Sequence, residues 1–372
     1  MTGNPVFGPN RLKLGIFCTN GRGAAHTLVP EAGALSWPMS LETARIADRD
    51  GYEAVVPFAR WKGHVRGQPQ HPSGIVLDPF TWAAAIAQAT ERVGVFVTSH
   101  APTVHPILAA KQLATIDIIS GGRLGLNVVG GWNKPEFDMF GAPLKEHGQR
   151  YEHLAEWLEL LERLWTEADE FDHHGRFFDV VGGFSKPTPL QMPHPPIMNA
   201  GGSDAGRHFA CRHADMCFAF LKSADPAKIR EEVDAYKRLA REQYHREVQV
   251  WGTGYVVQRD TVQEAEDYHR YYTVERQDVA AVDGWVEMQK EQTRIMPPAV
   301  LETFRARFAG GSGGFPLVGT AATIAERLEM LSACGVDGML LTWVDYLDGM
   351  KRFGEGVLPR LEQASLRERS GR

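Results

Sequence analysis

Short apolar segments alternate with longer amphipathic stretches along the whole chain. Runs rich in β-branched residues predict strands, and the stretches after them carry apolar residues at helical spacing. The predicted strands are Leu12–Phe17, Glu53–Pro57, Val93–Thr98, Leu124–Val128, Ile197–Ala200, Met216–Ala219, Val248–Val257 and Gly338–Thr342. The predicted helices are Ser40–Asp50, Asp78–Thr90, Pro106–Ser120, Gln149–Trp165, Asp204–Cys211, Pro226–Glu242, Val262–Tyr271, Ala321–Cys334 and Leu347–Arg360. This alternation predicts an α/β protein in which parallel strands close into a (β/α)8 TIM barrel.

Two segments interrupt the alternation. Residues 169–181 hold two aromatic-bearing runs around a turn at His174–Gly175, which predicts a hairpin on the barrel rim. Residues 273–315 are too long for a structureless loop, so we expect a partly helical insertion before the last βα unit, with a mobile glycine-rich tail. Insertions at a barrel rim can act as lids. Residues 1–372 then form one domain, because such barrels often exceed about 250 residues.

The charge and composition of the chain exclude several classes of binding partner. The net charge is −6 and no basic run is present, so neither nucleic acid nor an anionic membrane is an expected partner. No apolar run approaches the roughly 20 residues of a membrane span, and the first ten residues lack the pattern of a signal peptide. The four cysteines form no CxxC pair and no zinc-type cluster, which predicts reduced thiols, a cytoplasmic protein and no metal.

The sequence AGGSDAG at Ala200–Gly206 follows a predicted strand and opens a predicted helix. Gly202 would let the backbone approach a ligand, while the first amides of the helix and the Ser203 hydroxyl would face an anion. This pattern indicates a phosphate site. The alternative is a tight strand–helix turn in which Ser203 or Asp204 serves only as the N-cap.

Asn127 lies inside an apolar run that should be a barrel strand. A buried amide needs hydrogen-bond partners, so Asn127 either bonds within the core or meets a ligand at the barrel mouth. Thr98 ends another predicted strand and should lie at the same rim, although threonine is also common in strands for packing reasons. His100 follows it as a candidate proton donor or acceptor, or as an ordinary loop histidine. Arg60 either neutralises an anion or lies at the surface.

Self-sufficient catalytic motifs are absent from the sequence. It shows no HExxH, P-loop or EF-hand pattern and no Ser-His-Asp order. The chemistry is therefore expected to depend on an organic cofactor.

The stretch Leu113–Gly141, LATIDIISGGRLGLNVVGGWNKPEFDMFG, resembles the class C, bacterial-luciferase-like flavin-dependent monooxygenases. The resemblance is greatest to the subgroup of pyrimidine oxygenase and dimethyl sulfone monooxygenase. Further blocks resemble the same family in the same order: GQRY at Gly148–Tyr151, FDHHGRFFDV, PTPLQMPHPPI at Pro187–Ile197, AGGSDAG and LLTWVDYLDGMKRFGEGVLP.

The resemblance implies a luciferase-like barrel with FMN at the C-terminal ends of its strands. Reduced FMN would come from a separate NAD(P)H:flavin reductase, O2 and a small molecule would be the other reactants, and the chain would be a homodimer or homotetramer. The residues matched to cofactor positions are Ala59, Arg60, Asn127, Glu136, Arg150, Tyr151 and Ser203. Thr98 and Asn127 match positions that hold O2 beside flavin N5, which implies a flavin-N5-oxide as the oxygenating species, with the C4a-(hydro)peroxide as the alternative. The family also implies a non-prolyl cis peptide around Ser99–Ala101.

Some positions depart from the resemblance. Ser99, His100 and Pro102 stand where small residues follow the third strand in the pyrimidine oxygenase, and the loop Thr19–Pro38 also differs, so the substrate is left open. Two alternative functions remain. One is an F420-dependent hydride-transfer oxidoreductase on the same barrel, which needs more basic contacts than the sequence offers. The other is a non-catalytic flavin-binding protein, which has no need of polar residues gathered at one rim.

Overall fold

Eight parallel strands close into a barrel in this computed structural model, which describes residues 3–142, 145–289 and 298–368. The strands pair in the order β1-β2-β3-β4-β7-β8-β9-β11, and β11 returns to β1. Their bounds are β1 Lys13–Phe17, β2 Ala54–Val56, β3 Gly94–His100, β4 Leu124–Val129, β7 Ile197–Asn199, β8 Met216–Ala219, β9 Gln249–Gln258 and β11 Gly338–Thr342. The TIM-barrel fold predicted from the alternating pattern is confirmed.

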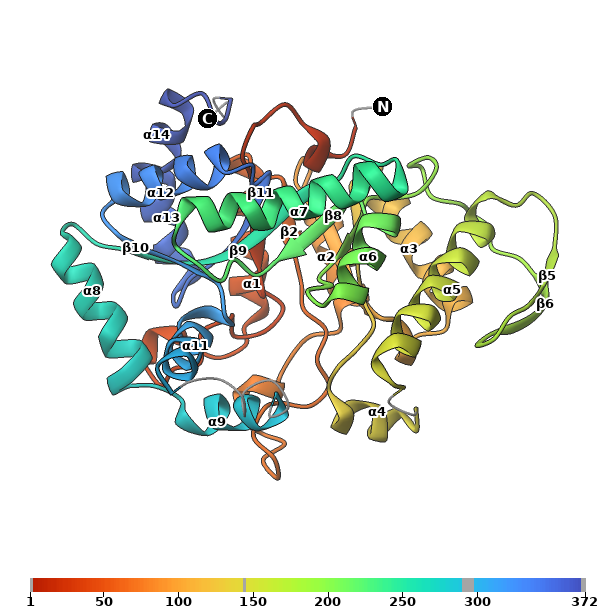
Figure 1. The fold of residues 1–372 in the computed structure, drawn as a ribbon, viewed down its shortest axis with the longest axis horizontal. Coiled ribbons are helices and arrows are strands. Elements are labelled where there is room, and N and C mark those ends of the chain that lie inside the picture. The colour runs from red at the N-terminus through yellow and green to blue at the C-terminus, as the bar shows by residue number, and fades with distance from the viewer. Residues whose placement is uncertain (1–2, 143–144, 290–297, 369–372) are drawn as a thin grey trace.

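Helices on the outside of the barrel connect the strands (Figure 1). They are α1 Trp37–Arg49, α2 Pro79–Ala89, α3 Pro106–Ser120, α5 His147–Thr166, α6 Asp204–His213, α7 Pro226–Tyr244, α8 Val262–Arg270, α12 Ala321–Ala333, α13 Tyr346–Gly356 and α14 Leu358–Gln363. Their starts follow local chemistry, because Ser36, Asp78 and Asp225 accept backbone N–H bonds as N-caps. The single helix predicted over Leu347–Arg360 is wrong: it is broken between α13 and α14, where Pro359 cannot donate a backbone hydrogen bond.

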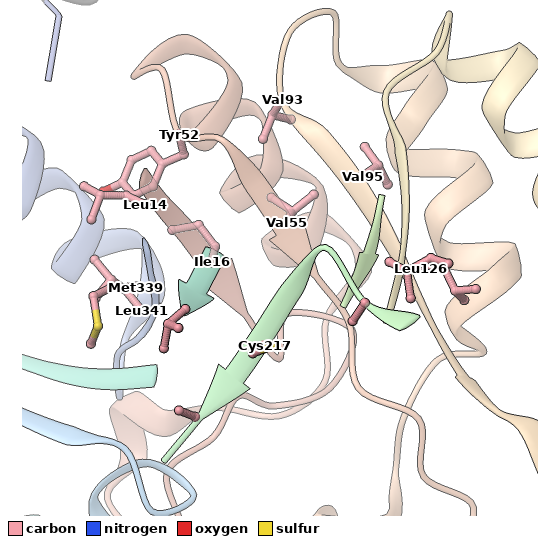
Figure 2. Packing of buried hydrophobic residues seen from close by; sticks show 14 of the residues in the cluster. Leu14, Ile16, Tyr52, Val55, Val93, Val95, Leu126, Cys217, Met339 and Leu341 are labelled. Carbon is pink, nitrogen blue, oxygen red and sulfur yellow. The ribbon is translucent and has the colours of Figure 1, made fainter. Parts of the chain in front are cut away.

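Two hydrophobic layers surround the strands. The outer layer lies between strands and helices, where Leu14, Ile16 and Val55 pack in one continuous cluster (Figure 2). The inner layer fills the barrel with Val6, Ala54, Val56, Phe96, Met198, Met216, Phe218, Trp251 and Leu340. A Cβ on Gly125 would lie 2.4 Å from the Phe96 ring, so the missing side chain makes room for that ring. The barrel interior is therefore a packed core below its mouth.

Further helices and a hairpin lie outside the barrel and its connecting helices. The antiparallel hairpin of β5 Phe171–His174 and β6 Asp179–Gly183 projects from one side (Figure 1). The insertion begins with a π-helix at Tyr271–Glu275 and continues through α9 Val279–Met288 and α11 Pro298–Gly311, so its described part is largely helical. Helix α4 Lys134–Phe140 lies on the same side of the molecule as α9 and α11, opposite α14.

The sequence pattern missed one strand. β10, Phe315–Gly319, pairs in parallel with the outer part of β9 beyond the closed ring. It begins where the predicted insertion was expected to end in a glycine-rich tail. The long β9 exposes a free edge past its barrel neighbour β8, and β10 satisfies the backbone groups there. None of the helices in the described residues is long and apolar enough to cross a membrane.

Candidate functional site

The inner face of β3 carries the side chains that reach the barrel mouth. Successive side chains of a strand point to opposite faces, so Phe96, Thr98 and His100 share the inner face. Phe96 belongs to the inner core, while Ser99 lies on the other face of the strand. Along β3, the side chains of the inner face thus change from apolar in the packed core to polar at the barrel mouth.

Thr98 and Asn127 meet across the pair of strands β3 and β4, where they are register partners. Asn127 Nδ2 donates to Thr98 Oγ1 at 3.0 Å, and the Thr98 hydroxyl donates in turn to the carbonyl of Pro57. Both residues are buried, yet Asn127 Oδ1 has no hydrogen-bond partner among the described residues. A buried amide oxygen without a partner costs about 1–3 kcal/mol, so this acceptor is expected to bond to a group from outside the chain, either a ligand or a water molecule.

His100 and Glu136 form a second buried pair at the mouth. His100 Nδ1 lies 3.5 Å from Glu136 Oε2, and both side chains are at most 9% exposed. The other carboxylate oxygen, Oε1, accepts the backbone N–H groups of Trp61 at 2.8 Å and Lys62 at 3.1 Å. Glu136 therefore ties α4 to the loop after β2 and orients the imidazole.

The ionisation of His100 reflects opposing influences. Burial lowers its pKa below the ordinary histidine value, the Glu136 carboxylate raises it, and the Arg60 guanidinium lowers it. Burial dominates, so the folded protein favours the neutral imidazole at neutral pH.

The loop after β2 brings Ala59 and Arg60 to the mouth. Arg60 Nη1 donates to the Ser73 carbonyl at 3.1 Å, and its guanidinium lies over the Phe58 ring at 4.8 Å. Burial lowers the pKa of Arg60, while Cys18 and Glu136 oppose that change. Ala59 is partly buried beside it.

The AGGSDAG turn and helix α5 meet at a second point of the rim. Ser203 caps α6 by accepting the Gly206 N–H at 3.1 Å. This agrees with the alternative interpretation of the sequence, in which Ser203 or Asp204 is the N-cap of the helix. Its hydroxyl also lies 3.5 Å from Tyr151 Oη. Arg150 Nη1 donates to the Gly131 carbonyl at 3.0 Å, and Arg150 Nε is buried without a partner in the described part of the chain. Gly202 is exposed at this turn.

The non-prolyl cis peptide expected around Ser99–Ala101 is wrong. The cis peptide bonds in the described residues are Lys186–Pro187 and Met192–Pro193. β3 runs two residues beyond its predicted end, and Ser99 and His100 continue the parallel register with Val128 and Val129. A cis bond outside X-Pro costs about 3–4 kcal/mol, and these residues take the ordinary trans form.

The tertiary structure adds residues that the sequence reading did not single out. His26, in the loop after β1, stacks on Phe308 of α11 with ring centroids 4.3 Å apart. His64, in the loop after β2, meets the same ring edge-on at 5.4 Å. Backbone bonds from His26 N to Ala309 O and from Leu28 N to Arg276 O join the first loop to the insertion. No local signal could reveal this assembly, because the insertion residue Phe308 is more than 200 residues from both His26 and His64.

These segments form a roof, by which we mean the loop after β1 (18–36), the loop after β2 (57–78) and the described insertion residues. The three meet at His26, His64 and Phe308, and a small hydrophobic cluster packs Ala25 and Val29 of the first loop against Tyr272. Within the described residues, no cluster of His, Cys, Asp or Glu could hold a metal ion.

Comparison with known protein families identifies the family of this barrel. The family model of the luciferase-like monooxygenases matches residues 12–338, which is most of the chain. The chain belongs to the luciferase-like monooxygenases. Within this family, it is 33% identical over 342 residues to the FMNH(2)-dependent dimethylsulfone monooxygenase of Pseudomonas putida, covering 90% of this chain and 91% of that protein. It is also 33% identical over 290 residues to the pyrimidine monooxygenase RutA of Escherichia coli O127:H6, covering 77% and 79%.

Solved structures share the luciferase-like fold. The riboflavin lyase RcaE, solved with modified FMN and riboflavin, superimposes with a TM-score of 0.82 at 23% identity, covering 96% of this chain and 93% of that one. DmoA from Hyphomicrobium sulfonivorans gives a TM-score of 0.80 at 22% identity, covering 97% and 92%. At these identities the likeness concerns the fold alone.

Proposed function

We propose that this protein is a two-component, FMN-dependent monooxygenase that uses reduced FMN and O2 to oxygenate a small molecule. The observation that carries the proposal is the buried Thr98–Asn127 pair at the barrel mouth, with the Asn127 amide oxygen left without a partner. The pair lies at the C-terminal ends of barrel strands, which is where barrel enzymes bind their ligands. Membership in the luciferase-like monooxygenases supports the same reaction class.

The residues at the mouth fit FMN. A phosphate needs hydrogen-bond donors, and the first amides of α6, the Ser203 hydroxyl and Tyr151 Oη lie together at one side of the rim. Arg150 lies on the same helix as Tyr151 and keeps an unpartnered Nε–H. Ala59, Arg60 and Gly202 are the further residues that we assign to the cofactor.

Glu136 requires a revised role in this proposal. The sequence matched it to a flavin position, but both of its carboxylate oxygens have protein partners: the Trp61 and Lys62 amides on one side and His100 on the other. We assign it to shaping the cofactor site through the loop that carries Ala59 and Arg60. The amide of Asn127 keeps free hydrogen-bonding capacity and is the direct cofactor contact.

When bound, reduced FMN supplies the electrons with which O2 is activated. Asn127 has an N–H and a carbonyl oxygen still available to orient reactants, whereas Thr98 fixes the amide by accepting its other N–H. His100 is the candidate to take or give a proton at its imidazole, held by Glu136. The loop after β2 contacts the mouth through Pro57 and the Trp61 and Lys62 amides, and we assign to the roof the exclusion of bulk water.

The test is oxygen incorporation. Purified protein, a flavin reductase, NADH and FMN are supplied under 18O2 with dimethyl sulfone, methanesulfonate or uracil, and products are analysed by mass spectrometry. We expect one 18O atom in the product of at least one substrate and no turnover without the reductase. Stoichiometric FMN binding with no substrate-dependent O2 uptake across a broader panel would favour the carrier, and turnover with reduced F420 under anaerobic conditions would favour the hydride-transfer enzyme.

The expected reductase partner and the oligomeric state belong to the same proposal. Relatives that are named FMNH(2)-dependent support the assignment of the electrons to a second protein that reduces FMN. A homodimer or homotetramer stays a prediction, which light scattering at micromolar protein concentration measures directly.

A further inference from the structure

A small hollow lies under the roof, between the loops after β1 and β2 and the start of α9. Arg22 and His26 line it from the first loop, Phe58 and Arg60 from the second, and Asp278 from the insertion. Its volume is about 10 Å³, which is close to the space that a single water-sized group occupies. The hollow can therefore accept one oxygen-sized atom of a larger molecule.

Positive charge dominates the lining. Arg22 Nη2 donates to the Thr27 carbonyl, and Arg60 Nη1 donates to the Ser73 carbonyl. Neither guanidinium makes an ion pair with a carboxylate in the described part of the chain. The remaining acid of the lining is already engaged, since Asp278 caps α9 through the Ala281 N–H and lies 3.3 Å from His71 Nε2.

Two nitrogen atoms of the lining residues lack partners. Arg22 Nε and His26 Nε2 are buried, and neither has a hydrogen-bond partner among the described residues. His26 is only 6% exposed, and burial together with the Arg60 and Arg22 guanidinium groups holds its pKa well below the ordinary value. A neutral imidazole can present an N–H to an acceptor without adding a third charge.

The hollow is held in shape by the roof. The His26 ring stacks on Phe308, which stacks in turn on Trp285 at 3.9 Å. The backbone of His26 is fixed at both ends, because its N–H donates to Ala309 O and its carbonyl accepts from Asp278 N. The unpartnered nitrogen atoms thus belong to a rigid wall, and a buried donor in a rigid wall is expected to have an acceptor.

We propose that Arg22 and His26 form a subsite for one oxygen of the substrate, of the kind found on a sulfonate, sulfone or carboxylate. The inference rests on the proposed monooxygenase function, since Phe58 of the hollow directly follows Pro57, whose carbonyl accepts the Thr98 hydroxyl. The oxygen enters the hollow, and the carbon skeleton remains outside it. Two cations opposite one engaged carboxylate favour a fully charged oxyanion over a neutral sulfone.

The experiment titrates methanesulfonate and dimethyl sulfone into the FMN-loaded protein by calorimetry. We expect methanesulfonate to bind more tightly than dimethyl sulfone. Arg22→Gln should weaken methanesulfonate binding by about tenfold or more, and Arg22→Lys should recover part of the loss, because a charged hydrogen bond is removed and then partly replaced. The matched control is Arg66→Gln, an exposed arginine in the loop after β2 that does not line the hollow.

The outcomes separate this inference from the proposed function. FMN affinity should stay within about twofold in Arg22→Gln, and an equal loss of FMN and methanesulfonate binding would assign Arg22 to the cofactor and overturn the subsite. Unchanged methanesulfonate binding in Arg22→Gln, or no binding of either probe to the wild-type complex at millimolar concentration, would also overturn it and identify the hollow as a water site. Failure of the wild-type protein to bind FMN would instead remove the proposed function. If Arg22→Gln does not fold, His26→Phe, which keeps the ring stack but removes the N–H, gives the same comparison.

Discussion

The Thr98–Asn127 pair shows how two ordinary strand residues become a site. Neither strand by itself shows what its polar residue contacts, but parallel pairing of β3 with β4 places the two as register partners above the packed inner core. The Thr98 hydroxyl donates to Pro57 O and accepts from Asn127, so it orients the amide and leaves the amide oxygen free. In the proposed function, the contact with the reactants is therefore assigned to Asn127.

Replacing Thr98 or Asn127 should uncouple NADH consumption from product formation while the protein still folds. We expect Thr98→Val and Asn127→Ala to lower product formed per NADH consumed by at least about tenfold and to raise hydrogen peroxide, with FMN affinity within about tenfold of wild type. Oxygen electrode, peroxide and fluorescence titrations measure these quantities. Ser99→Ala is the control, because Ser99 lies on the opposite face of β3; equal coupling in all variants would remove the pair from the site.

Glu136 should act through His100 rather than on the substrate. Glu136→Gln keeps an oxygen acceptor for the Trp61 and Lys62 amides but removes the charge that raises the pKa of His100. That pKa then falls further, so the acid limb of the kcat/KM profile should move to lower pH. Asp138→Asn, an exposed residue of the same helix, should leave the profile in place. An unshifted profile in Glu136→Gln would contradict the pairing.

At the scale of elements, the start of α6 depends on the absence of side chains. A Cβ on Gly206 would lie 2.3 Å from Tyr151 Oη and 2.7 Å from Gly201 Cα, so the turn and α5 could not keep their present approach. Close packing here brings the Tyr151 and Ser203 oxygen atoms together. Gly206 thus serves packing, and access of a ligand at this turn stays a prediction.

Gly206→Ala should weaken FMN binding by about tenfold or more, since the tyrosine must leave the Ser203 hydroxyl. The control is Gly148→Ala in the first turn of α5, where an added Cβ meets nothing within 4 Å. Fluorescence titration of FMN, with a thermal melt to confirm folding, measures both variants. Wild-type affinity in a folded Gly206→Ala protein would place the phosphate elsewhere.

At the scale of the whole molecule, buried histidines link stability to pH. Burial lowers the pKa of His26, His64, His100 and His153, in the last case to about 4. The unfolded chain therefore binds more protons than the folded protein once the pH falls below about 6.5, the ordinary histidine value. Each histidine then removes up to about 1.4 kcal/mol of stability per pH unit until its folded pKa is reached.

We expect the free energy of unfolding to fall steadily between about pH 7 and pH 5. His64→Phe tests one contributor, because both His64 ring nitrogen atoms are buried without a partner in the described residues and the ring packs edge-on against Phe308. Urea unfolding at several pH values should show a smaller slope for this variant than for wild type. His174→Gln, an exposed position in the hairpin, should keep the wild-type slope.

Much of the barrel could be predicted from the sequence because its causes are local. The spacing of apolar residues, the N-caps and the breaks at glycine or proline all act within a few residues of the chain. The predicted ends of the eight barrel strands and of most outer helices therefore lie within two or three residues of the observed ends. Thr98, Asn127 and the AGGSDAG turn were singled out because polar or small residues interrupt or follow predicted strands; the structure pairs Thr98 with Asn127, and their part in the reaction stays a prediction. β10 was missed because it is defined by the free edge of β9 and not by its own pattern.

Only the tertiary structure decided how distant residues meet. The sequence by itself determined the family, the barrel and the position of a polar mouth. The revised role of Glu136, the break before α14, the trans peptides at Ser99 and His100, and the hollow beside Arg22 all depend on contacts between separate elements. Whether a polar group has a hydrogen-bond partner depends on which residues lie next to it in space. Those neighbours come from distant parts of the chain, so the local sequence pattern does not identify them.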